Sequence, residues 1–71
     1  MKHKSVILFI VGQLMNDEYS DDKEMVDHLA CESGLDVGKI ERLVKFERSR
    51  FLQDRWIDER LAVAVVKKYL A

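Results

Sequence analysis

The sequence predicts an all-α fold, a small bundle of three to four short helices, in a single helical domain that covers residues 1–71. The chain contains no proline and only three glycines, so few residues interrupt a helix. Apolar residues make up 48% of the chain and charged residues 35%, which suits a modest core beneath a charged surface. Apolar residues also recur at helical spacing along four segments, which are the predicted helices.

The first predicted helix covers about residues 5–15. Its wide apolar face consists of Val6, Ile7, Phe9, Ile10 and Leu14. The β-branched run at residues 6–11 is also compatible with a strand, for which residues 61–66 are the available partner. The pattern alone leaves both arrangements open.

The second predicted helix follows a polar, turn-forming break at residues 16–22 and ends at about Ser33. Ser20 or Asp21 can cap its first turn, and Asp21 with Glu24 has the spacing of a capping box in which Asp replaces the usual Ser or Thr. Gly34 is expected to end this helix, because glycine accepts the left-handed conformation of a C-terminal cap. The residues expected to point inward are Met25, Val26, Leu29 and Ala30.

The third predicted helix begins after Asp36 and runs to about Arg50. One sector of its helical wheel is apolar and contains Ile40, Leu43, Val44 and Phe51. Arg42, Lys45 and Arg48 are placed roughly opposite, with Lys39 toward one side. These basic side chains are therefore expected to face solvent.

The fourth predicted helix begins near Asp54 or Asp58 and ends at about Leu70. Residues 61–66 are apolar all round, and a helix without a polar face is normally buried on several sides. Four short helices offer little material to surround it. We therefore predict a homodimer in which this helix, together with the first, meets its symmetry mate.

The second and third helices are expected to meet at a tight corner. Ala30 is small enough to lie where two helices cross closely, and Gly34 supplies the turn between them. Asp36 can cap the next helix by accepting hydrogen bonds from its first free N–H groups. Ile40 and Leu43 lie one turn apart and return the chain to the core.

With this spacing, residues 26–45 resemble the helix-turn-helix superfamily of DNA-binding proteins, at the level of the motif and of no particular family. The resemblance implies a small transcriptional regulator or accessory factor whose third helix enters the major groove of double-stranded DNA. Residues 37–50 carry five basic and two acidic side chains, which suits that role. Arg42 and Lys45 would lead the contacts, while Lys39, Arg48 and Arg50 would bind phosphates.

The acidic charge just before this segment supports a different interpretation. Residues 16–36 carry eight acidic side chains and a single basic one, Lys23, although the whole chain has a net charge of only −1. Acids in the first turn of the second helix oppose the approach of a DNA backbone. The alternative is a non-enzymatic helical protein–protein interaction or oligomerisation module that does not bind DNA, with the acidic second helix recruiting a protein partner.

The remaining chemistry-bearing residues favour no enzyme activity, cofactor or metal site. His28 and Cys31 lie near each other on the second helix, but no further histidine or cysteine pair completes a metal shell, so they are interpreted as an exposed imidazole and a half-buried thiol. The aromatic residues Phe46, Phe51, Trp56 and Tyr69 are expected to fill the core or a dimer seam, with Phe46 partly exposed. A single cysteine and no membrane-spanning stretch indicate a cytoplasmic protein without a membrane partner.

Overall fold

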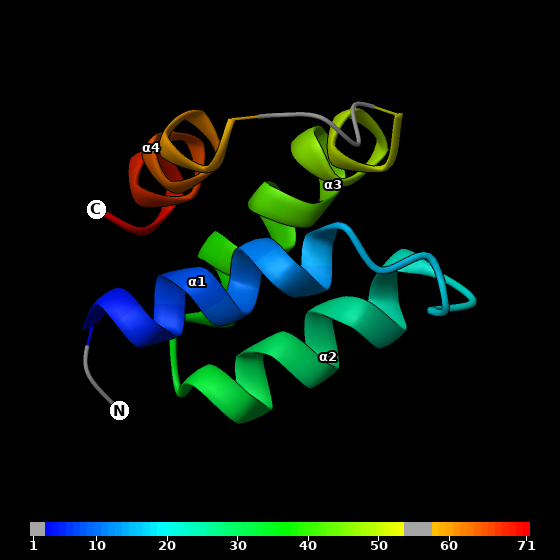
Figure 1. Cartoon of the computed structure of the whole chain (residues 1–71). Helices are drawn as coiled ribbons and strands as arrows, with labels where there is room; N and C mark the ends of the chain where they lie inside the picture. Colours follow the sequence, from blue (N-terminus) through cyan, green and yellow to red (C-terminus); the bar gives the residue numbers. More distant parts are fainter. Residues whose placement is uncertain (1–2, 54–57) are drawn as a thin grey trace.

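The computed structural model describes residues 3–53 and 58–71, and this part of the chain forms four helices and no strand (Figure 1). The helices are α1 (His3–Leu14), α2 (Asp22–Ser33), α3 (Val37–Gln53) and α4 (Glu59–Leu70). The predicted all-α fold is confirmed. The strand alternative is wrong, since residues 6–11 lie in α1 and residues 61–66 lie in α4, two helices that pack against each other. Burial of their apolar faces outweighs the strand preference of β-branched residues.

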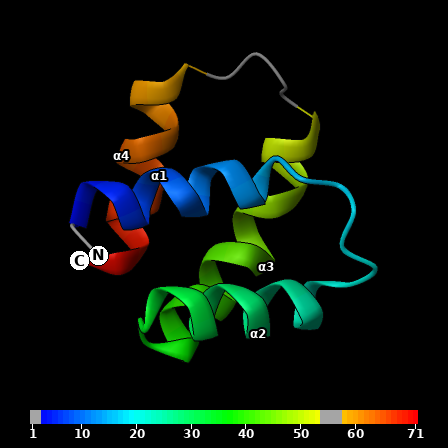
Figure 2. The same cartoon turned by 60° about the horizontal axis from the view of Figure 1, so that its bottom comes forward.

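Both α1 and α3 contact all three of the other helices, and the longest of the four is α3 (Figure 2). It continues to Gln53, beyond the predicted end at Arg50, and this extra turn holds Phe51 fully buried in the core. All four helices contribute to one apolar core. Its buried side chains are Val6, Ile7, Ile10, Val11, Leu14, Met25, Val26, Leu29, Ile40, Leu43, Val44, Phe51, Ala62 and Val66.

The corner between α2 and α3 has the predicted local geometry. Gly34 adopts φ 70° and ψ 13°, the left-handed region, and its N–H donates to the carbonyl oxygen of Ala30 over 3.0 Å. Asp36 caps α3, with its carboxylate accepting the Lys39 N–H over 3.0 Å. Asp21 caps α2 in the same way, through the Glu24 N–H over 2.7 Å.

The last helix, α4, is less buried than the apolar composition of residues 61–66 predicts. Asp58 caps α4 by accepting the Arg60 N–H over 2.7 Å, whereas the alternative start at Asp54 lies outside the described residues. Ala62 and Val66 are buried, but Leu61 is 57% exposed and Ala64 is exposed. Within the described ranges, every helix is too short or too polar to cross a bilayer.

Candidate interaction surfaces

Two of the five predicted DNA-contacting residues, Arg42 and Lys45, are exposed on α3, as the helical wheel predicts. Among the described residues, neither forms an ion pair within the chain. The Lys45 Nζ atom lies 5.6 Å from the centroid of the Phe46 ring, a cation–π arrangement. These two cations are therefore accessible to an anionic partner.

Arg48 is placed differently, and the expectation that it faces solvent opposite the apolar sector is wrong. Its side chain is only 9% exposed, with Nη1 donating to Asp22 Oδ1 over 2.7 Å and Nη2 donating to the Tyr19 carbonyl oxygen over 3.0 Å. Residue 48 follows Val44 by four positions and precedes Phe51 by three, so it lies beside the apolar sector and not opposite it. Its guanidinium group joins α3 to the start of α2.

The last two predicted cations, Lys39 and Arg50, have partners within the chain. Lys39 is half-buried, and its Nζ donates to the Ala71 carbonyl oxygen over 3.2 Å. Arg50 lies 3.7 Å from a Glu47 carboxylate oxygen, although its side chain remains 54% exposed. Arg50 can still reach an anion, because about half of its side chain is exposed and the separation from Glu47 is long for an ion pair.

Acidic side chains lie close to the exposed cations of α3. A shallow groove between α2 and α3 is lined by Asp22, Asp27 and Glu41 together with Lys23 and Lys45. The remaining lining residues are Val26, Val37 and Val44. Three carboxylates against two ammonium groups lower the local attraction for a phosphate backbone.

The aromatic residues divide between core and surface. Phe51 is fully buried, whereas Phe46 is 61% exposed, and Trp56 lies outside the described residues. Tyr69 is half-buried, and its hydroxyl donates to Glu47 Oε1 over 2.9 Å. This hydrogen bond to a carboxylate raises the pKa of the Tyr69 phenol above its ordinary value of 10.0, and burial raises it further.

His28 and Cys31 are both exposed, so the expectation of a half-buried thiol is wrong. The His28 ring centroid lies 5.6 Å from that of Tyr19 and 6.2 Å from that of Phe9, which gives the imidazole an aromatic environment.

The pKa of Tyr19 is raised above its ordinary value, mainly by burial of the phenol and next by the negative charges of Glu24 and Glu18. Across the described residues, no group of three or more His, Cys, Asp or Glu side chains has a geometry that could hold a metal ion.

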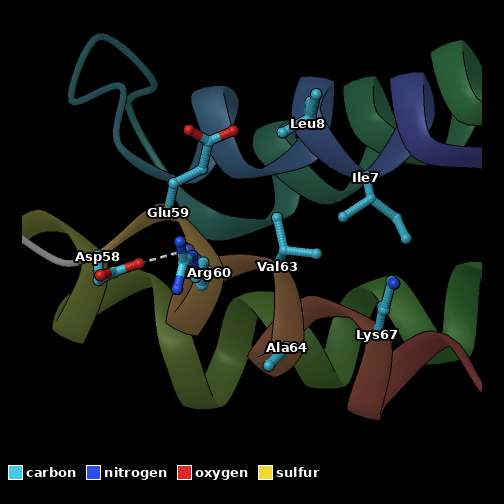
Figure 3. Close-up of a pocket in the computed structure, with 8 residues that line it drawn as sticks. All are labelled: Ile7, Leu8, Asp58, Glu59, Arg60, Val63, Ala64 and Lys67. Atoms are coloured by element: carbon cyan, nitrogen blue, oxygen red, sulfur yellow. Dashed lines mark hydrogen bonds between the residues drawn. The ribbon is translucent and has the colours of Figure 1, made fainter.

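A further concave surface of the described residues lies between α1 and α4, and it is more voluminous than the groove between α2 and α3 (Figure 3). Its apolar part is formed by Ile7 and Leu8 from α1 and by Val63 and Ala64 from α4. Charged residues complete the lining, with Asp58, Glu59 and Arg60 near the start of α4 and Lys67 toward its end. In Figure 3, Glu59 and Lys67 lie at opposite ends of this stretch of α4. We call this surface the α1/α4 groove.

Sequence reasoning located the α1/α4 groove only in part. The all-round apolar stretch at residues 61–66 indicated an unsatisfied surface on α4, and α1 was expected beside it. Leu8, which is 36% exposed, was not singled out. A helical-wheel projection of α1 predicts the exposure of Leu8, since this aliphatic residue lies outside the face formed by Ile7, Ile10 and Leu14.

Comparison with known proteins adds no relative: no protein-family model, no curated protein and no solved structure matches this chain.

Proposed function

We propose that this chain is a non-enzymatic helical interaction module that self-associates through the α1/α4 groove. The observation that carries the proposal is the groove itself, whose apolar part exposes Leu8 and Ala64 and part of Val63 above the buried Ile7, between charged ends. Such a mixture of an apolar centre and a polar rim is typical of protein interfaces. The predicted homodimer would use this surface, since it was expected to form through the same two helices.

The size of the chain gives a second reason for self-association. A bundle of 71 residues buries a limited core, and in domains of this size apolar burial exceeds the cost in chain entropy by only a small margin. Leu8 is 36% exposed, so covering it in a dimer would contribute about 1 kcal/mol per copy. Covering Val63 and Ala64 adds to that term, because both also line the groove.

The experiment is a blocking substitution inside the groove with a matched control outside it. Ala64 is exposed, so Ala64→Arg introduces a bulky charged side chain that the monomer can accommodate. Ser49 is exposed on α3 and is not among the residues that line the groove, so Ser49→Arg adds the same side chain elsewhere. Arginine is a good helix former, so neither change should unfold its helix.

Light scattering coupled to gel filtration would report the mass of each variant. We expect a dimer for the wild type and for Ser49→Arg, and a monomer for Ala64→Arg. Equal masses for the wild type and both variants would contradict the proposal. A dimer that Ser49→Arg disrupts and Ala64→Arg does not would also contradict it.

A second candidate function is binding of double-stranded DNA through α3. The observation that favours it is the exposure of Arg42 and Lys45, unpaired within the described residues, on the helix that follows the Gly34 corner. Its test is a titration with random duplex DNA at low and at moderate salt. A groove binder weakens by orders of magnitude as salt rises from about 50 to 200 mM. An absence of binding at low salt would exclude this function, and an unchanged affinity in Arg42→Ala would exclude Arg42 as a base-reading residue.

A further inference from the structure

The charges along the α1/α4 groove are arranged so that the groove complements itself. Glu59, Val63 and Lys67 line it from α4 at intervals of four residues, with the acid near the start of the helix and the base near its end. Eight residues of helix span about 12 Å, so the two opposite charges stand well apart with an apolar residue midway. Reversing the direction of the helix therefore exchanges the positions of the acidic and the basic residue.

We infer that the occupant of the groove is α4 of a second copy of this chain, packed antiparallel about a two-fold axis at Val63. In this register Glu59 of one copy lies opposite Lys67 of the other, and the symmetry makes the pair twice. This inference rests on the proposed self-association and specifies its geometry.

Other arrangements of the two helices bring like charges together. A parallel pair places Glu59 against Glu59 and Lys67 against Lys67. An antiparallel pair shifted so that its axis falls between Val63 and Ala64 places Arg60 opposite Lys67, while Lys68, the residue that Glu59 would then meet, is not among the residues that line the groove. Like charges that face each other weaken an interface and select against the wrong register. The α4 charges therefore favour the register centred on Val63.

The size of the side chains at the centre is compatible with close packing. Ala64 follows Val63 directly, is exposed, and lines the groove, so it offers little bulk between the two backbones. Leu8 of α1 lies on the opposite wall of the groove and can cover the flank of the incoming helix. Both α1 and α4 then contribute to the contact, as the groove geometry requires.

The test is a charge exchange between the two ends of α4. Glu59→Lys alone and Lys67→Glu alone each replace two attractive pairs by two repulsive ones, and each should raise the dimer Kd about ten-fold or more. Glu59→Lys combined with Lys67→Glu in one chain restores both pairs in the exchanged order. This double variant should recover a Kd close to that of the wild type.

A mixture of the two single variants provides the sharpest result. In a heterodimer, the introduced lysine of one chain faces the introduced glutamate of the other, and the native Lys67 faces the native Glu59 at the second position. The mixture should therefore associate more tightly than either variant alone. Loss of helix stability cannot produce that rescue, because both chains in the mixture keep their substitutions. Glu41→Lys, a reversal of an exposed acid on α3, serves as the control and should leave the Kd unchanged.

Sedimentation equilibrium of the wild type, the single variants, the double variant and the mixture gives each Kd. A wild-type dimer whose Kd is unaffected by the single reversals would overturn the register and leave self-association standing. A dimer weakened by the single reversals but rescued neither by the double variant nor by the mixture would overturn it equally. A wild-type chain that stays monomeric would overturn both the register and the proposed function.

Discussion

Replacing Gly34 by alanine and replacing Gly12 by alanine should change the free energy of unfolding in opposite directions. Gly34 has φ 70°, and a Cβ atom built on it would meet no heavy atom within 4 Å. Gly12 lies in the last turn of α1, where a Cβ atom would also meet nothing within 4 Å. Since neither site is crowded, Gly→Ala at each position reports on backbone conformation alone.

The magnitudes follow from the two conformations. Holding an alanine in the left-handed region costs about 1–2 kcal/mol, of which the lower entropy of the unfolded chain returns about 0.5 kcal/mol. Gly34→Ala should therefore lower the free energy of unfolding by about 1 kcal/mol. Gly12→Ala should raise it by about 0.5–1 kcal/mol, since alanine is the better helix former.

Far-UV circular dichroism during thermal and urea unfolding measures both effects, at one fixed protein concentration because self-association shifts the midpoint. A change of 1 kcal/mol moves Tm by roughly 4–8 °C in a domain of this size. Gly34→Ala should melt about 5 °C lower than the wild type and Gly12→Ala a few degrees higher. A Gly34→Ala variant as stable as the wild type would refute the left-handed corner, and equal destabilisation by both would refute the conformational argument.

The remaining predictions concern the side chains that join the helices. Asp22→Asn should destabilise the fold by about 1–2 kcal/mol, because it leaves the buried guanidinium group of Arg48 without its charged partner. Arg48→Met should destabilise it less, because this change removes the buried charge and keeps an apolar side chain in its place. Urea unfolding of both variants would show the order, and a costlier Arg48→Met would contradict it. The pKa of Tyr69 is raised in the folded state, so the folded chain holds this proton more tightly and wild-type stability should fall as the pH rises above 10.0. Tyr69→Phe should be less stable at neutral pH by about 1 kcal/mol, for the lost hydrogen bond to Glu47, but should lose less stability on the alkaline side. Parallel pH slopes for the wild type and Tyr69→Phe would refute this assignment.

The elements that the sequence predicted correctly depend on local interactions. Asp21 and Asp36 accept hydrogen bonds from N–H groups three residues ahead, and Gly34 ends its helix through its own backbone conformation. Such features involve a few neighbouring residues, so their spacing is visible in the chain. The exposure of Arg42 and Lys45 was predictable for the same reason, because position on a single helix decides it.

The features that escaped prediction depend on residues far apart in the chain. The partner of Arg48 is Asp22, which lies 26 residues earlier, and no local pattern indicates that pair. The continuation of α3 to Gln53 follows from the burial of Phe51 against the rest of the core. The α1/α4 groove combines the first helix with the last, so only the packed bundle determines which side of the apolar stretch in α4 stays open.

In the proposed dimer, two copies of the chain meet through the α1/α4 groove. Amide NMR spectra recorded over a dilution series test it residue by residue, because resonances at an interface shift as the dimer dissociates. We predict concentration-dependent shifts at Leu8, Glu59, Val63 and Lys67, with the resonances of α2 unchanged. Spectra that do not change with dilution, or shifts confined to α2 and α3, would contradict this dimer.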